Sequence, residues 1–133
     1  MTPIVLDTDV ASLSFKRHLP STLLARLAGR EPVITFVTLG ELTKWVERRH
    51  WGPSRRSHLS NWLNGVGVLH STDKVSRVWG EISAFAEPRG RPRPKNDTWI
   101  AACCLAEELP LATLNVKDFS DFAEHEGLTI VTA

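Results

Sequence analysis

The sequence predicts an α/β fold of three layers, in which a central parallel sheet of five strands is covered by helices on both faces. Short apolar runs alternate with longer segments of helical periodicity. The apolar runs lack strict alternation with polar residues, which is typical of strands buried on both faces. The 133 residues suit one compact domain with a real core, so we expect a single domain over residues 1–133.

The expected strands are short runs rich in Val, Ile and Leu. The first ends in an acid and the others are bounded by polar residues, glycine or proline. In order they are PIVLD (3–7), VITFV (33–37), VGVLH (66–70), PLAT (110–113) and LTIVT (128–132).

Helices are expected where apolar residues recur every three to four positions. The ranges are 9–16, 21–28, 38–50, 54–65, 72–87 and a helix that opens at Asn96. Prolines in segment 88–95 exclude a helix or a central strand there, so this segment is expected to be a loop.

Composition excludes several classes of protein. No apolar run approaches the roughly 20 residues that a membrane crossing needs. The two cysteines, Cys103 and Cys104, are adjacent, which indicates small core residues and neither a disulfide framework nor a metal site. The N-terminus reaches an acid too early for a signal peptide, and a cytoplasmic location is favoured.

Positive charge is concentrated in two places although the formal net charge is only +1. The run RGRPRPK, residues 89–95, carries four positive charges and no acid. Arg48, Arg49, Arg55 and Arg56 form a second cluster around Trp51. Such runs occur on solvated surfaces and also in phosphate-binding surfaces, and composition alone leaves both interpretations open.

One predicted helix begins with an acid although it is apolar on every side. In NDTWIAACCLA, residues 96–106, Asp97 precedes eight small or apolar residues. Asn96 as an N-cap and Asp97 in the first turn offer one explanation, since an acid there complements the helix dipole. Another explanation depends on which groups lie near this end of the helix.

Three further acids are predicted at the same edge of the sheet. Asp7 ends the first strand, Glu41 lies in the first turn of the helix after the second strand, and Asp118 follows the fourth strand. The carboxyl ends of parallel strands share one edge, where α/β proteins bind their ligands. A helix that runs antiparallel to the strands, as the Asp97 helix does, begins at that edge. Four carboxylates from distant parts of the chain should therefore converge.

Each acid also has a purely structural interpretation. Asp7 could cap the helix that follows it, Thr38 and Glu41 could form a capping box, and Asn115 with Asp118 could cap a turn. Together, however, four crowded carboxylates repel one another unless a cation neutralises them. Oxygen ligands without His or Cys suit Mg²⁺ or Mn²⁺, and these ions support in-line hydrolysis of phosphodiesters.

Other enzyme classes find little support in the motifs. The sequence contains no H-E-x-x-H zinc motif, no G-x-S-x-G nucleophile elbow and no glycine-rich phosphate loop. A metal-dependent nuclease needs none of these.

The sequence resembles the PIN-domain ribonucleases, and more closely the VapC-type toxins of toxin–antitoxin pairs. The matching stretches are IVLDTDVAS near the start, VTLGEL (37–42), RPKNDTWIAACCLAEELPLAT (93–113) and NVKDF (115–119). They cover essentially the whole chain in the order and at the spacing of the family. The resemblance implies a single PIN domain, a five-stranded parallel α/β/α sandwich and endonucleolytic cleavage of RNA at an acidic pocket that binds Mg²⁺ or Mn²⁺.

The resemblance also assigns roles to individual residues. The catalytic quartet would be Asp7, Glu41, Asp97 and Asp118. Asp7 and Asp97 would be the most direct metal ligands, Asp118 would bind directly or through water, and Glu41 would hold or activate the attacking water. Thr113 and Asn115 would support these acids as hydrogen-bonding neighbours, and Thr8, beside them, would form a hydrogen bond near the phosphate.

Two positions depart from the family pattern. Leu114 replaces an arginine that is common in the family, which removes a positive charge and changes the expected RNA contacts. Asp9 stands where asparagine is common. It is either a fifth acid at the edge of the pocket or an N-cap, and we favour the cap.

Partners are implied as well. The family forms homodimers and is inhibited by a VapB-type antitoxin whose C-terminal segment blocks the site. Trp45, Trp51 and Trp62 lie on the early helices where such partners could dock, although burial in the core is the commoner fate of tryptophan. The basic loop just before Asp97 is expected to contact the RNA backbone, through Arg89, Arg91, Arg93 and Lys95.

Two alternative functions stay open. In a haloacid-dehalogenase-like phosphatase, Asp7 would be the nucleophile and Asp9 the general acid, but Lys117, Asp118 and Asp121 imitate the remaining motif poorly. In a non-catalytic RNA-binding PIN module, the fold would bind RNA without cutting it. The presence of all four acids does not favour that alternative.

Overall fold

The computed structural model describes residues 2–90 and 93–133, which contain one sheet of five parallel strands. All five predicted strands are present, with their ends shifted by one to three residues. They are β1 (Thr2–Leu6), β2 (Arg30–Thr35), β3 (Gly67–Leu69), β4 (Leu111–Ala112) and β5 (Ile130–Val131), in the spatial order β3-β2-β1-β4-β5.

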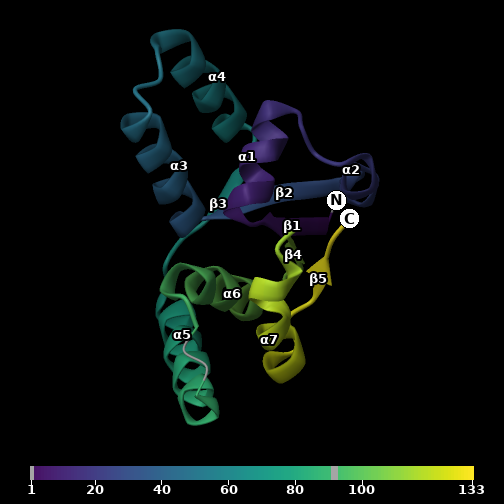
Figure 1. Ribbon diagram of the computed structural model, residues 1–133, viewed down its shortest axis with the longest axis vertical. Helices are drawn as coiled ribbons and strands as arrows, with labels where there is room; N and C mark the ends of the chain where they lie inside the picture. The colour runs from purple at the N-terminus through teal and green to yellow at the C-terminus, as the bar shows by residue number, and fades with distance from the viewer. Residues whose placement is uncertain (1, 91–92) are drawn as a thin grey trace.

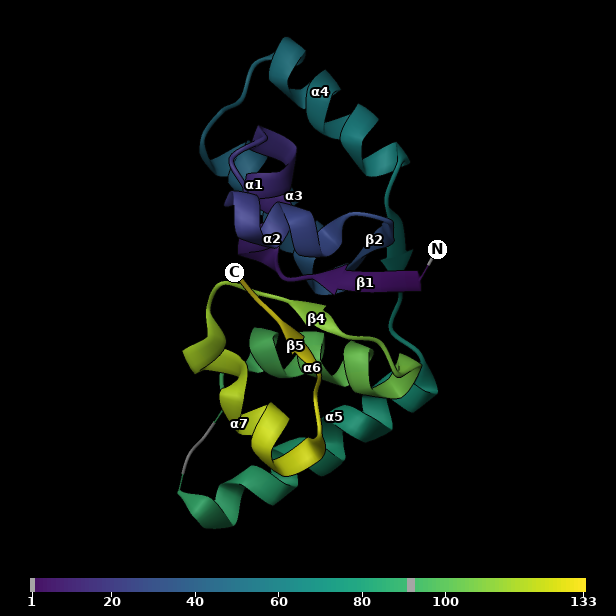
Figure 2. The same cartoon turned by 90° about the vertical axis from the view of Figure 1, so that its right-hand side faces the viewer.

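Helices cover both faces of this sheet, as the sequence predicts (Figure 1). One layer holds α1 (Thr8–Lys16), α2 (Ser21–Leu27), α3 (Phe36–Arg48) and α4 (Pro53–Asn64). The other holds α5 (Asp73–Ala86), α6 (Lys95–Glu107) and α7 (Val116–Glu126), with the short 3₁₀ helix η1 (Glu87–Arg89) after α5. Figure 2 shows the two layers above and below β1 and β4. Within residues 2–90 and 93–133, no helix has both the length and the apolar character required to span a membrane.

The core explains why the strands are apolar throughout. Side chains of a strand alternate between its two faces. In β1, Ile4 and Leu6 pack with the first helical layer, whereas Val5 packs with the second, and all three are buried. Both faces of the sheet therefore need apolar residues, so the strands do not alternate between apolar and polar positions.

The order of the strands creates a crevice beside β1. The chain adds β2 and β3 on one side of β1 and then returns to add β4 and β5 on the other. In sheets of this kind, ligands bind at the carboxyl ends of the strands where the order reverses. Leu6 pairs with Ala112 in register, so the residues that follow them, Asp7 and Thr113, are neighbours.

The start of α3 differs from the prediction. Phe36 and Val37, expected at the end of the second strand, form the first turn of α3 instead. Thr35 caps the helix, because its hydroxyl accepts a hydrogen bond from the Thr38 amide at 3.2 Å. The capping box predicted for Thr38 and Glu41 is therefore wrong: both residues lie inside the helix, and Glu41 is in its second turn.

The start of α6 also differs. Asn96 is not its N-cap; the cap position is Pro94, which makes no capping hydrogen bond through a side chain, and the helix begins at Lys95. Asp97 remains in the first turn, as predicted. The expected loop at 88–95 is partly the 3₁₀ helix η1, and residues 91 and 92 lie outside the described residues.

The helix α7 is missing from the elements that the sequence predicts. Its apolar face is narrow: among the described residues of α7, only Phe119 and Phe122 are buried, and the remaining positions are mostly polar or charged. Asn115 stands at its N-cap without a side-chain capping bond, so the expected cap by Asn115 is absent. The packing of the two phenylalanines, more than local signals, accounts for this helix.

Phe122 should contribute strongly to stability, because it is fully buried between α7 and the sheet layer. We expect Phe122→Ala to lower the free energy of unfolding by about 3–5 kcal/mol, measured by urea denaturation. Phe85 is the matched control, since it is 59% exposed on α5. Phe85→Ala should change the same quantity by less than about 0.5 kcal/mol. Equal losses in the two variants would contradict this account of the core.

Candidate active site

A cleft of about 120 Å³ opens at the carboxyl ends of β1 and β4. It brings together the four acids expected from the sequence and adds a fifth. Its lining consists of Asp7, Thr8, Asp9, Glu41, Trp45, Asp97, Ile100, Asn115, Asp118 and Phe119. A larger hollow of about 810 Å³ lies between α1 and α4, but no carboxylate lines it among the described residues. The acid chemistry therefore belongs to the smaller cleft.

Asp7 is the most firmly held of the acids. It caps α1, because one of its carboxylate oxygens accepts a hydrogen bond from the Val10 amide at 2.8 Å, which confirms the predicted cap. Its other oxygen accepts from the Thr113 hydroxyl at 2.5 Å. The Thr113 hydroxyl in turn accepts from the Asn115 amide at 2.9 Å. Asp7 is thus fixed by the first turn of α1 and by the chain that follows β4.

Burial opposes the negative charge of Asp7. The side chain is only 3% exposed, and this burial raises the pKa of Asp7 to about 6. Hydrogen bonds from Thr113 and Val10 act in the opposite direction, and the charges of Asp9 and Asp97 raise the pKa further. No lysine, arginine or histidine lines the cleft among the described residues, so no positive side chain there offsets the burial of Asp7.

Glu41 is oriented by two buried threonines. The Thr8 hydroxyl donates to a Glu41 oxygen at 2.8 Å and lies 2.9 Å from the Thr38 hydroxyl. Thr8 has one proton to give, so Thr38 must donate to Thr8. This chain of hydrogen bonds joins α1 to α3 and directs Glu41 into the cleft. Thr38 is a member of the site that the sequence analysis assigned only to capping.

Asp97 and Asp118 lie in the first turns of α6 and α7. Partial burial raises the pKa of Asp97 to about 6, and the charges of Asp118, Glu41 and Asp9 add to this effect. Among the described residues, none donates a hydrogen bond to the Asp97 carboxylate. The helix dipole favours an acid at this position, but burial and, after it, the neighbouring acids raise the pKa of Asp97 nevertheless.

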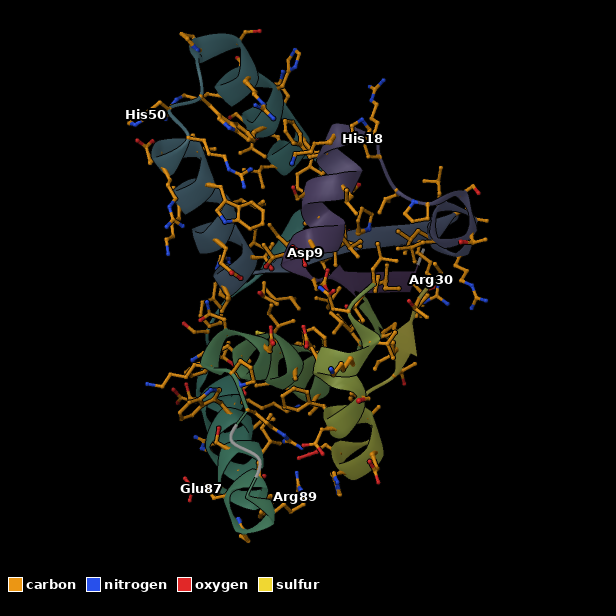
Figure 3. All side chains as sticks on the ribbon, in the orientation of Figure 1. Asp9, His18, Arg30, His50, Glu87 and Arg89 are labelled. Atoms are coloured by element: carbon orange, nitrogen blue, oxygen red, sulfur yellow. The ribbon has the colours of Figure 1, made fainter. Side chains whose placement is uncertain are left out.

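Asp9 lies at the edge of the cleft and is not an N-cap, because Asp7 occupies that position. The favoured interpretation of Asp9 is therefore wrong, and the other one, a fifth acid, holds. Figure 3 shows Asp9 at the base of α1, beside the gap between the helical layers. The Asn115 side-chain amide donates to it at 2.6 Å, which connects the start of α7 to α1.

The chemistry of the cleft fits a hard divalent cation. Its polar lining consists of carboxylates, one hydroxyl and one amide, and among the described lining residues there is no Lys, Arg, His or Cys. Carboxylate oxygens are the ligands that Mg²⁺ and Mn²⁺ prefer. Burial and, after it, neighbouring acids raise the pKa values of Asp7 and Asp97, and such a cation would offset both effects.

The oxygens in the cleft are spaced more widely than in a preformed metal cage. In the described part of the chain, the one group of three ligating side chains with atoms within 4.8 Å of one another is Asp121, Glu124 and His125, outside the cleft. Asp121 is already bound by Arg89 and Arg93, so we give that group no metal. Wider spacing suits Mg²⁺, which keeps several waters and needs few carboxylates.

The basic segment before α6 is used inside the protein. The Arg93 side chain is only 5% exposed and binds Asp121 at 2.7 Å and Glu126 at 2.6 Å. It also lies 4.2 Å above the Phe122 ring and donates to the Ile82 carbonyl. These contacts occupy its guanidinium, which corrects the expectation that Arg93 binds RNA phosphates.

The other basic residues of segment 89–95 differ in where they lie relative to the cleft. Arg89 shares Asp121 with Arg93 and lies at the far end of α5 from Asp9 (Figure 3), so it is badly placed for a strand in the cleft. Arg91 lies outside the described residues. Lys95 is exposed at the start of α6, and its contact with the RNA backbone stays a prediction.

The three early tryptophans differ in exposure. Trp51 is 9% exposed, stacks on Phe15 at 5.9 Å and is covered by Arg55, so it belongs to a small core cluster and is not a docking surface. Trp62 is partly buried in the same cluster. Trp45 is partly exposed and lines the acidic cleft, a location that the sequence did not indicate.

The fold and the acidic cleft define a family. Residues 4–125 match the family model described as PIN domain, so the chain belongs to the PIN-domain family, as the resemblance implied. Two curated relatives are named ribonucleases. They are Ribonuclease VapC2 of Rickettsia felis, 27% identical over 86% of this chain and 88% of the relative, and Ribonuclease VapC1 of Haemophilus influenzae strain R2866, 28% identical over the same shares.

Solved structures agree in fold over almost the whole chain. VapBC2 from Rickettsia felis, bound to a DNA fragment from their promoter, matches with a TM-score of 0.82 at 22% identity, covering 98% of each chain. VapBC-5 from Mycobacterium tuberculosis, a member of the VapBC family of toxin–antitoxin systems, matches with a TM-score of 0.77 at 25% identity, covering 100% of each chain.

The raised pKa of Asp97 predicts a gain in stability when its charge is removed. A carboxyl that titrates at about 6 in the folded chain and at 3.8 when unfolded binds more protons when folded, so stability falls as pH rises from about 4 to 6. We expect Asp97→Asn to stabilise the chelator-treated protein at pH 7 by about 1 kcal/mol, a figure reduced for partial exposure to solvent. The gain should vanish below about pH 4, and urea denaturation against pH would measure it.

The ion pairs of Arg93 predict a large loss of stability when Arg93 is replaced. Arg93→Gln leaves the nearly buried Glu126 without its cation and leaves Asp121 with Arg89, so we expect a loss of about 3 kcal/mol in the free energy of unfolding. The control is Arg77→Gln, because Arg77 is 71% exposed and its ion pair with Asp73 is 3.8 Å long. That variant should lose less than about 0.5 kcal/mol. A small loss for Arg93→Gln would show that its ion pairs are not structural.

Proposed function

We propose that this protein is a metal-dependent endoribonuclease that acts as the toxin of a toxin–antitoxin pair. The observation that carries the proposal is the convergence of Asp7, Glu41, Asp97 and Asp118 in one cleft of a PIN domain. The names of the relatives, Ribonuclease VapC1 and VapC2, support RNA as the substrate. The mechanism is hydrolysis of a phosphodiester bond by water.

The cleft residues divide the work between binding and proton transfer. Asp7, Asp97 and Asp118 would hold Mg²⁺ or Mn²⁺, which would neutralise the carboxylates and polarise the phosphodiester. Glu41 orients the attacking water and takes its proton, and the Thr8 hydroxyl keeps the Glu41 side chain in place. Thr113 fixes the rotamer of Asp7, and Asn115 positions both Thr113 and Asp9.

The partner of the toxin would be a VapB-type antitoxin. Solved relatives are complexes named VapBC, which supports an antitoxin for this chain. A homodimer and a cytoplasmic location follow from the same proposal. Lys95, exposed two residues before Asp97, would contact the RNA backbone near the cleft.

Cleavage should need both a divalent cation and Asp97. We expect purified protein to cut cellular RNA into discrete fragments with Mg²⁺ or Mn²⁺ and to cut nothing with chelator. Asp97→Asn should lower the rate at least about a hundredfold while the protein stays folded. Fragment analysis by gel and fold analysis by circular dichroism would measure both.

The matched control is Asp73→Asn. Asp73 also lies in the first turn of a helix, but its side chain is 96% exposed and outside the cleft. This variant should cut like the unmodified protein. Intact RNA under every metal, together with hydrolysis of a small phosphate ester through a trapped phospho-aspartate, would favour the phosphatase alternative. Tight RNA binding without any cleavage would favour the non-catalytic module.

A further inference from the structure

We propose that Trp45 is a binding platform for an unpaired nucleobase of the RNA strand, next to the bond that is cut. Lys44 and Arg49 flank it and would hold the phosphates on either side. The proposal rests on the ribonuclease activity proposed above and adds the path by which the strand leaves the cleft. It assigns to α3 the role of the main RNA-binding element.

Trp45 lies where the acidic cleft continues outward. The residue lines the cleft together with Glu41, and the same two residues also line a neighbouring hollow of about 440 Å³. The wall of that hollow includes Lys44 and the amide side chain of Asn96. A strand whose phosphate sits in the cleft therefore meets an aromatic ring, a cation and an amide at its next step.

The periodicity of α3 places three functional groups in a row. Three residues, Glu41, Trp45 and Arg49, follow one another at intervals of four, so they share one face of the helix. Each of the three lies about 6 Å further along the helix axis than the one before it. The Arg49 guanidinium lies 5.4 Å from the centre of the Trp45 ring. In Figure 3, α3 can be followed from its first turn near Asp9 outward to His50, just beyond its end.

Available positive charge also favours this path. An acidic cleft repels a phosphate strand, so cations must hold the strand on either side. Arg93 and Arg89 are bound to acids of α7, and Arg56 binds Glu47. Lys44 and Arg49 are exposed, and within the described residues no carboxylate forms a salt bridge with either. They are therefore free to pair with phosphates.

The other tryptophans are less suited to bind a base. Trp51 is buried, and Trp62 is partly buried in the same cluster, where its ring contacts Phe15. Trp79 and Trp99 stack on each other with their ring centres 4.8 Å apart. Bases of single-stranded RNA stack on exposed aromatic rings, and such stacking tolerates different sequences. A base that reaches Trp45 would displace the Arg49 side chain from the ring and leave its guanidinium free for the adjacent phosphate.

The test measures RNA binding in a protein that cannot cut. The probe is a short, fluorescent, single-stranded oligoribonucleotide of mixed sequence, added to the Asp97→Asn protein in the presence of Mg²⁺. Adding Trp45→Leu, which keeps an apolar side chain against the core, should weaken binding about tenfold. Trp45→Phe keeps a ring and should retain most of the affinity. Arg49→Gln should lower the salt dependence of binding by about one ion, whereas the control Arg55→Gln should not.

A second series identifies the base. Single abasic nucleotides are moved along the probe in turn. With Trp45 present, removing the base at one position should weaken RNA binding about tenfold. In the Trp45→Leu protein, removing the same base should not weaken binding further. If the loss of affinity from Trp45→Leu and the loss from the missing base multiply at every position, the proposal is wrong. So would a Trp45→Leu variant that binds RNA normally and changes only dimerisation or antitoxin affinity.

This outcome can be separated from that of the proposed function. Cleavage of RNA by the protein with intact Asp97 tests the nuclease, whereas the abasic series tests only the platform. Cleavage without any effect of Trp45 would remove the platform and leave the nuclease. Absence of cleavage under every metal would remove the nuclease.

Discussion

The structure depends on one electrostatic constraint: five carboxylates share a small cleft that no lysine or arginine among the described residues lines. The pKa of Asp7 and that of Asp97 both rise to about 6, chiefly through burial and further through neighbouring acids. Such crowding destabilises the metal-free chain, so the surrounding structure must hold the acids in place. The β1–β4 pairing, the cap of α1 and the chain of threonines provide that support.

Positive charge is separated from this cleft within the second helical layer. Arg93 binds Asp121 and Glu126 and packs on Phe122, so it ties the segment before α6 to α7. These are the two helices whose first turns carry Asp97 and Asp118. Burial alone would raise the pKa of Asp121, but hydrogen bonds from Arg93 and Arg89 lower it. An aspartate beside arginine therefore ionises more readily than an aspartate in the cleft.

The sequence predicts the sheet and the converging acids well, because both follow from spacing along the chain. Apolar runs and the rule that parallel strands end at one edge are enough to bring Asp7, Glu41, Asp97 and Asp118 together. Details that depend on tertiary contacts were not predictable. Arg93 has its partners about 30 residues further along, Thr38 meets Thr8 across two helices, and α7 depends on two buried phenylalanines.

Asp97 shows how magnitudes decide between a structural and a functional role. An acid in the first turn of a helix gains about 0.3–1 kcal/mol from the dipole when it is exposed. In α6 the pKa of Asp97 is nevertheless raised, so burial and the neighbouring acids exceed that gain. The helix begins at Lys95, and no side chain caps it, so Asp97 does not serve as a cap. Asp97 lowers stability and caps no helix, and the function proposed for the cleft explains it, because its charge would bind the metal ion there.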